Sequence, residues 1–179
     1  MPHLPSRGFT WLEVVMVLAI MAFLAAVALP SLSDALARHR LRAAATALLD
    51  TLRQSREAAL HRPKGTRVCP SENGRTCSGR TDWGVGWISR DGDTNAILAV
   101  EDALDARLTA ASTGVRTDVV FPHPADEMAE PSNQTLALCV RGKPETTLTV
   151  VVAKNGHSHA EPAAPEVARA CAAHHSRIR

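Results

Sequence analysis

The sequence contains few aromatic residues. Among its 179 residues there is no tyrosine, and only three tryptophans and three phenylalanines occur. An aromatic side chain buries about 150–250 Å², so a core with few of them removes less apolar area from water. Covalent cross-links then matter more to the stability of a small domain.

The chain also lacks a strong excess of charge of either sign. Twenty Lys and Arg residues oppose eighteen Asp and Glu, which leaves a formal net charge of +2. Proteins that bind nucleic acid over much of their surface carry a larger positive excess. Nothing at the level of the whole chain therefore indicates such a partner.

Catalytic signatures are missing as well. The sequence has no Gly-x-Ser-x-Gly, no Walker-type phosphate loop and no His-Glu-x-x-His. Asp91-x-Asp93-x-Asn95 begins like a calcium-binding loop, but Ala96 and Asp102 stand where such a loop has glycine and glutamate. A turn is the better interpretation, and we expect no enzyme activity, no catalytic residue and no cofactor.

One long apolar run occurs near the amino terminus. It extends from Phe9 to Leu29, and Glu13 is its only charged residue. At 1.5 Å per residue, a helix of about 20 residues crosses a bilayer core of about 30 Å. A carboxylate in such a helix costs roughly 2.5–3.5 kcal/mol, so it usually has a partner. We expect a transmembrane helix over residues 9–29.

The eight residues before this run end in Arg7-Gly8, and they are too short and too polar for an ordinary secretory signal. Arg7-Gly8-Phe9-Thr10, followed by Glu13 and an apolar helix, resembles the class III signal of type IV prepilins. The resemblance implies that prepilin peptidase removes residues 1–8 by cutting between Gly8 and Phe9. It also implies that Phe9 is methylated and that Glu13 pairs with the amino terminus of a neighbouring subunit. A plain single-span anchor is the alternative.

The helical pattern continues beyond the apolar run. Apolar residues recur at three- and four-residue steps while the arginines fall mostly elsewhere, which predicts one buried face: Leu41, Ala45, Leu48, Leu52 and Ala59. Pro63-Lys64-Gly65 ends the pattern. We expect an amphipathic continuation of the helix over residues 30–62.

From residue 63 onward the pattern is typical of strands. Period-two alternation predicts strand segments over residues 66–69, 83–88, 96–100, 115–121, 135–140 and 146–153. The Pro-Ala-Ala-Pro of residues 162–165 indicates the start of a flexible tail. A helix followed by strands predicts an α+β fold, in which an antiparallel sheet domain over residues 63–179 packs on the helix.

The chain has four cysteines, Cys69, Cys77, Cys139 and Cys171. Arg7 favours a cytoplasmic leader, which places the rest of the chain in the periplasm, where disulfides persist. Of the three possible pairings, we favour Cys69–Cys77, which closes a short polar loop, and Cys139–Cys171, which ties the tail to a late strand. Zinc is the alternative, but no Cys-x-x-Cys spacing supports it, and we expect no metal.

Several later motifs resemble the FimT/FimU minor pilins and the GspH pseudopilins of type II secretion. They are Arg56-Glu57-Ala58, Val68-Cys69, Cys77, Trp83-Gly84-x-Gly86-Trp87-Ile88, Asp91, Cys139-x-Arg141-Gly142, Val150-Val151-Val152, Gly156 and Cys171. The resemblance covers nearly the whole chain. It implies a pilin fold and a minor pilin with a single inner-membrane span. The implied partners are prepilin peptidase, other major and minor pilins and inner-membrane lipid. The alternative function is that of a GspH-like pseudopilin in a type II secretion system.

The tail departs from the pattern of the DNA-binding FimT proteins, which carry Gly-Arg-x-Arg where this chain has Gly156-His157-Ser158-His159. Arginine is always charged and binds phosphates in a fork, whereas an ordinary histidine is mostly neutral above pH about 6.5. We favour a polar turn without a ligand. DNA is the alternative partner, held by Lys154, His157, His159, Arg169, Arg177 and Arg179 with His174 and His175 in mild acid. Metal capture by these histidines is the third hypothesis.

Overall fold

The structure is a computed structural model that describes residues 10–125 and 133–173, apart from the side chains of residues 27–31. Its contacts divide the chain into two units, Met1–Leu36 and Ala37–Arg179, and each is described by itself.

Helix α1 extends from Trp11 to Ala59 and covers most of both segments that the sequence predicts as helical, ending three residues before the predicted end at residue 62. Thr10 caps its start, because its Oγ1 accepts a hydrogen bond from the Glu13 backbone N–H at 3.3 Å. Among the described residues, no helix is both long enough and apolar enough to cross a membrane. The span expected over residues 9–29 stays a prediction.

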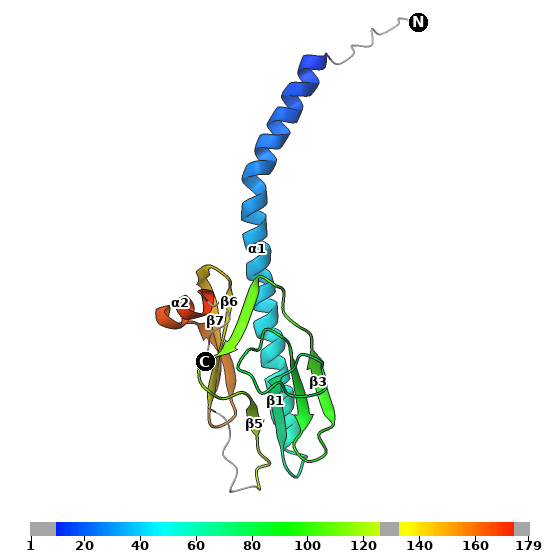
Figure 1. Cartoon of the computed structure of the whole chain (residues 1–179), viewed down its shortest axis with the longest axis vertical. Coiled ribbons are helices and arrows are strands. Elements are labelled where there is room, and N and C mark those ends of the chain that lie inside the picture. Colours follow the sequence, from blue (N-terminus) through cyan, green and yellow to red (C-terminus); the bar gives the residue numbers. More distant parts are fainter. Residues whose placement is uncertain (1–9, 126–132, 174–179) are drawn as a thin grey trace, which may run out of the picture. The chain divides into compact units, whose positions relative to one another are not determined.

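The described part of the second unit contains two antiparallel sheets of four strands (Figure 1). The first has the order β3-β2-β1-β5, formed by β1 (Thr66–Pro70), β2 (Trp87–Asp91), β3 (Ile97–Glu101) and β5 (Val119–Phe121). The second has the order β4-β6-β7-β8, formed by β4 (Leu108–Ser112), β6 (Gln134–Val140), β7 (Lys143–Val152) and β8 (Ser158–Pro162).

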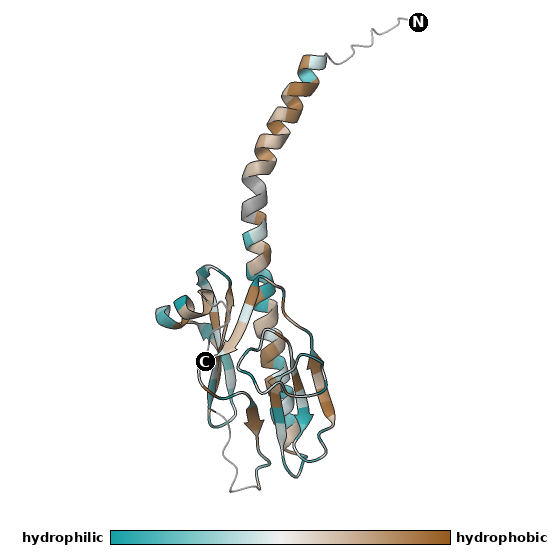
Figure 2. Cartoon of the chain, in the orientation of Figure 1, coloured by the Kyte–Doolittle hydropathy of each residue, from teal (hydrophilic) through white to brown (hydrophobic). Residues whose placement is uncertain are grey.

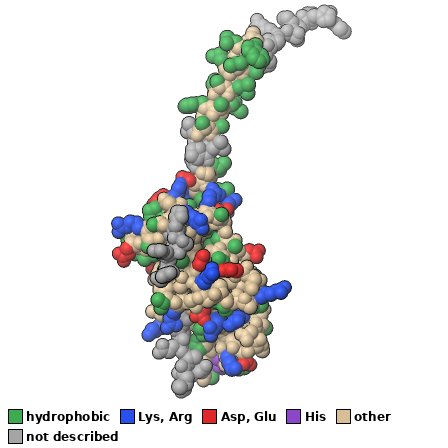
Figure 3. Space-filling model, in the orientation of Figure 1, with side chains coloured by type: hydrophobic (Ala, Val, Ile, Leu, Met, Phe, Trp, Pro, Cys, Tyr) green, Lys and Arg blue, Asp and Glu red, His purple; other side chains and the backbone are tan. Residues whose placement is uncertain are grey.

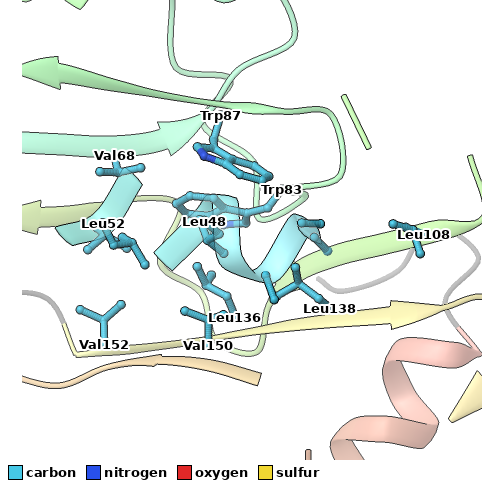
Figure 4. Close-up of a cluster of buried hydrophobic side chains, with 14 of the residues drawn as sticks. Leu48, Leu52, Val68, Trp83, Trp87, Leu108, Leu136, Leu138, Val150 and Val152 are labelled. Carbon is cyan, nitrogen blue, oxygen red and sulfur yellow. The ribbon is translucent and has the colours of Figure 1, made fainter. Parts of the chain in front are cut away.

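The carboxyl-terminal half of α1 supplies the centre of the core. The five residues predicted to form its buried face are all nearly inaccessible, which confirms that prediction: Leu41, Ala45, Leu48, Leu52 and Ala59. Figure 4 shows Leu48 with Trp83 and Trp87 on one side and Leu136 and Val150 of the second sheet on the other. Both sheets thus bury their apolar faces against one helix, and the predicted α+β fold is confirmed.

A second, smaller core lies on the opposite face of the second sheet. Helix α2 (Pro165–Ala172) packs there, and Val167 and Cys171 contact Ala137 and Cys139 of β6. The prediction of a flexible tail from residue 162 onward is wrong for residues 165–172, which form this helix. Proline suits the first turn of a helix because that position needs no backbone donor, so Pro165 begins this helix instead of preventing it.

The strand predictions also differ from the structure at four places, one of them β8 (Ser158–Pro162), which lies where the sequence predicts a polar turn and then a tail. Strand β4 (Leu108–Ser112) was not predicted, because alanine and serine are weak strand formers outside a packed sheet. Residues 83–86 form a turn before β2, in which the N–H groups of Trp83 and Gly84 both donate to the Ala110 carbonyl. Of residues 115–121, only 119–121 form a strand.

Candidate functional site

The first candidate site is the apolar surface of α1 over residues 11–24. The large apolar side chains here are exposed, and Figure 3 shows them gathered along this part of the helix: Trp11, Leu12, Val14, Val15, Met16, Val17, Leu18, Ile20, Met21, Phe23 and Leu24. A continuous apolar surface of this kind marks a protein or membrane interaction site.

Glu13 is the only acidic residue within this surface, and it lies in the first turn of α1. The positive end of the helix dipole favours a carboxylate at this position. Once the surrounding side chains enter an apolar environment, the carboxylate needs a cation beside it. The arrangement therefore suits an assembly contact with a positively charged group of another chain. The predicted cleavage residues, Gly8 and Phe9, lie outside the described residues.

The second candidate site is the turn between β7 and β8, residues 153–157. Gly156 has a φ of +75°, and its N–H donates to the Ala153 carbonyl at 2.8 Å. The turn continues with His157, whose N–H donates to Asn155 Oδ1 at 3.0 Å. A side chain at Gly156 would approach Arg56 Nε to 2.9 Å, so glycine lets the turn lie directly against α1.

The structure brings together some of the residues predicted for DNA. The rings of His157 and His159 stack with their centroids 6.0 Å apart, and Lys154 is exposed in the same hairpin. His159 Nε2 lies 3.5 Å from Glu161 Oε2. The carboxylate of Glu161 would therefore neutralise part of any positive charge on the His159 ring. Arg169 lies on α2, where its Nε donates to the Pro165 carbonyl. Arg177, Arg179, His174 and His175 lie outside the described residues.

Sequence reasoning missed one cation at this turn. Arg56 and Lys154 line the same pocket of about 210 Å³, whose other lining residues are mostly apolar: Ala59, Leu60, Phe121, Pro122, Pro124, Asn155 and Gly156. The sequence places Arg56 only in a helix-end motif, because the residues that meet it come from distant segments. No local pattern indicates such a contact.

Two disulfides lie in the second unit. The structure joins Cys69 to Cys77, with Cα atoms 5.5 Å apart, and Cys139 to Cys171, with Cα atoms 6.1 Å apart. These are the two pairings that the sequence favours, and no cysteine is free. Within residues 10–125 and 133–173, no group of three or more His, Cys, Asp or Glu side chains is placed to hold a metal ion.

The Asp91 turn uses its carboxylate to hold the chain together. Asp91 Oδ1 accepts hydrogen bonds from the backbone N–H groups of Asp93 and Thr94, at 2.8 and 2.9 Å. These bonds, that of Thr94 first, hold the pKa of Asp91 below its usual range, and Arg62 adds to the effect from 3.3 Å. Lys64 Nζ contacts Asp93 Oδ1 at 2.7 Å. The turn is thereby tied to the segment that follows α1.

An amino-terminal helix packed by its later half between antiparallel sheets is a pilin fold. The family described as Type II transport protein GspH matches residues 44–156, more than half of the chain. The chain therefore belongs to the GspH family.

Solved structures agree with this assignment at the level of the fold. Two crystal structures of the type IV minor pilin FimU from Pseudomonas aeruginosa PAO1 are similar to this chain. The first, in space group P21, has 22% identity and a TM-score of 0.54, and the match covers 70% of this chain and 90% of that one. The second, in space group P65, has 20% identity and a TM-score of 0.52, covering 68% and 92%. No curated protein matches the chain significantly.

Proposed function

We propose that this protein is a minor pilin that is processed by prepilin peptidase and incorporated into type IV pili. Residues 9–29 anchor it in the inner membrane before assembly, and the disulfide-bonded domain lies in the periplasm. The observation that carries the proposal is the exposed apolar surface over residues 11–24 with Glu13 as its single carboxylate. Such a surface needs an apolar environment, and its carboxylate needs a cation.

The freed amino terminus of Phe9 in a neighbouring subunit supplies that cation. A subunit in the membrane holds Glu13 at a cost, and pairing with the amino terminus of the next subunit removes this cost only in the assembled fibre. The same contact therefore drives assembly and sets the axial position of each subunit. A pseudopilin of a type II secretion system would use the same chemistry, and genes for secretion proteins beside this one would favour that alternative.

Replacing Glu13 with alanine separates insertion from assembly. We expect Glu13→Ala to insert normally, because it removes a charge from an apolar helix. The variant leaves the amino terminus of the neighbouring subunit without a partner, and an unpaired member of a buried ion pair costs about 3–5 kcal/mol. The amount of Glu13→Ala in sheared fibres should therefore fall at least about tenfold. Immunoblots of the fibre and membrane fractions measure both quantities. Glu57→Ala, an exposed change in the same helix, is the control, and normal incorporation of Glu13→Ala would contradict the mechanism.

DNA binding by the β7–β8 hairpin is the second candidate function, because Arg56, Lys154 and two stacked histidines gather there. We expect weak binding without sequence preference that decreases steeply with salt, since only phosphates are contacted. Affinity should be higher at about pH 5.5 than at about pH 7.5, because a histidine contributes positive charge only when it is protonated. Fluorescence anisotropy with a labelled duplex measures these dependences.

A paired substitution tests whether the histidines are responsible. His157→Arg with His159→Arg should strengthen binding at pH 7.5 several-fold and flatten the pH dependence, because arginine is charged throughout. Arg75→Ala, an exposed change in the loop that Cys69 and Cys77 close, is the control for general loss of positive charge. If the double substitution of His157 and His159 leaves binding unchanged, the DNA site lies elsewhere. No binding at pH 5.5 in low salt would remove the DNA candidate.

A further inference from the structure

The two sheets present four edge strands, and three of them are protected from further pairing. Strand β5 has only three residues and is followed at once by Pro122. Strand β4 is buried throughout, and Asp82 pairs with Ala111 across its edge. Strand β8 carries His159 and Glu161 and ends in Pro162. Short strands, charges, proline and covered edges are the usual means of preventing unwanted strand pairing.

Strand β3 has none of these protections over residues 97–100. It pairs only with β2 within the described residues, and its sequence, Ile97-Leu98-Ala99-Val100, contains no charge and no proline. Because side chains alternate along a strand, apolar residues lie on both of its faces. Val100 is 51% exposed and Ile97 is 39% exposed. Figure 1 shows β3 at the border of its sheet, and Figure 2 shows brown, apolar colour along much of it.

The charges at the end of β3 indicate what pairs with it. Glu101 and Asp102 are exposed, and neither carboxylate forms an ion pair within the described part of the chain. They line a hollow of about 620 Å³ together with Val85, Val100 and residues 71–75. Arg75 is the only cation in this lining, and Glu72 already pairs with Arg80. The carboxylates of Glu101 and Asp102 therefore leave the hollow with a net negative charge. An incoming strand would be favoured by a Lys or Arg opposite these carboxylates.

A second copy of β3 does not satisfy this requirement. In an antiparallel pair centred on Ala99, Glu101 of each copy would face Ile97 of the other, and no cation would meet a carboxylate. In a parallel pair in register, Glu101 would face Glu101, which is repulsive. The edge is therefore suited to a different chain.

We propose that β3 is a docking edge for an extended segment of another subunit. This segment has apolar residues at alternate positions and ends in Lys or Arg. Backbone N–H and C=O groups of the free edge pair with the incoming strand, and the apolar side chains on both faces exclude water from it. Glu101 and Asp102 set its register by pairing with the terminal cation. The proposal rests on the proposed function for the source of the segment, but the docking edge itself can be tested separately.

The first experiment uses the purified full chain in detergent and a synthetic peptide, Lys-Thr-Val-Thr-Val-Thr-Lys, carrying a fluorescent label. We expect saturable binding by anisotropy. It should be lost when every peptide nitrogen is methylated, and it should weaken about fivefold for the same peptide with Glu at both ends, because opposite charges across strands attract. Absence of binding, or equal binding of all three peptides, would overturn the proposal.

Variants locate the binding on β3. Leu98→Lys should abolish binding, whereas Leu98→Val should keep it, since valine suits a strand. Glu101→Gln with Asp102→Asn should weaken binding of the lysine-ended peptide about fivefold and strengthen that of the glutamate-ended one, because a repulsion between like charges is removed. Val115→Lys is the matched control, because Val115 is 89% exposed and lies outside every strand. Loss of binding in Val115→Lys, or full binding in Leu98→Lys, would overturn the assignment to β3.

Two further measurements identify the occupant. A chain ending at Ala173 should bind the peptide no more tightly than the full chain; tighter binding would show that the chain's own basic tail occupies β3 and would overturn the proposal. In cells, Leu98→Lys should lower incorporation into sheared fibres several-fold, with normal processing, while Val115→Lys incorporates normally. Peptide binding with unchanged incorporation would show that the partner is not a fibre subunit. A wild-type chain absent from fibres would refute the proposed function and leave the peptide results as the test of the edge.

Discussion

Removing the Cys139–Cys171 disulfide should destabilise the folded domain more than removing Cys69–Cys77. The two bonds close loops with sequence separations of 32 and 8 residues. The chain-entropy model gives a stabilisation of about 3.7 kcal/mol for the longer loop and about 2.5 kcal/mol for the shorter one. Cys139 and Cys171 are also both buried between β6 and α2, so their loss leaves unfilled space. For a domain of this size we expect a fall in melting temperature of roughly 10–15 °C.

The measurement is thermal unfolding of the oxidised protein and of two paired variants, Cys139→Ala with Cys171→Ala and Cys69→Ala with Cys77→Ala. The second pair is the matched control, because it removes the same number of sulfur atoms. We expect its melting temperature to fall by less than about 10 °C. A reducing agent should lower the melting temperature of the wild type below that of both variants. An equal or larger effect of the Cys69–Cys77 pair would contradict this ranking.

The helix and its buried face could be predicted from the sequence because both are local periodic features. Leu41, Leu48 and Leu52 fall on one side of a 3.6-residue repeat whatever packs against them, and the structure confirms their burial. Strands with many β-branched residues, such as β7, were predicted for a similar reason. By contrast, β4 contains Leu-Thr-Ala-Ala-Ser, and it is a strand because β6 pairs with it along its whole length. That pairing is a tertiary contact with no local signal.

The same distinction between local sequence patterns and tertiary contacts applies to the candidate sites. Glu13 could be recognised from sequence, because a single carboxylate in a long apolar run is itself the signal. The pocket shared by Arg56 and Lys154 could not be, since it forms only where the end of α1 meets the β7–β8 turn. The unprotected edge of β3 depends on the order of strands in the sheet, and a list of strand segments does not give that order.

Replacing Gly8 with glutamate should abolish processing and, with it, incorporation into fibres. Glycine has no side chain, so a peptidase can approach its backbone closely, whereas glutamate adds both bulk and charge beside the scissile bond. The uncleaved chain keeps residues 1–8, and its Phe9 nitrogen remains an uncharged amide. That chain cannot offer a cation to the carboxylate of its neighbour, so the pairing of Glu13 is lost from the side of the amino terminus.

Intact-mass spectrometry of the membrane fraction measures this directly. The wild type should begin at a methylated Phe9, and Gly8→Glu should retain the whole leader and be absent from sheared fibres. Ser6→Glu is the matched control, because it introduces the same side chain two residues earlier and leaves Gly8 in place; we expect it to be cleaved. Gly8→Glu and Glu13→Ala should then fail at the same step for complementary reasons, one lacking the cation and the other the carboxylate. A wild-type chain that begins at any residue other than Phe9, or a Gly8→Glu chain that is cleaved normally, would refute the processing that this mechanism requires.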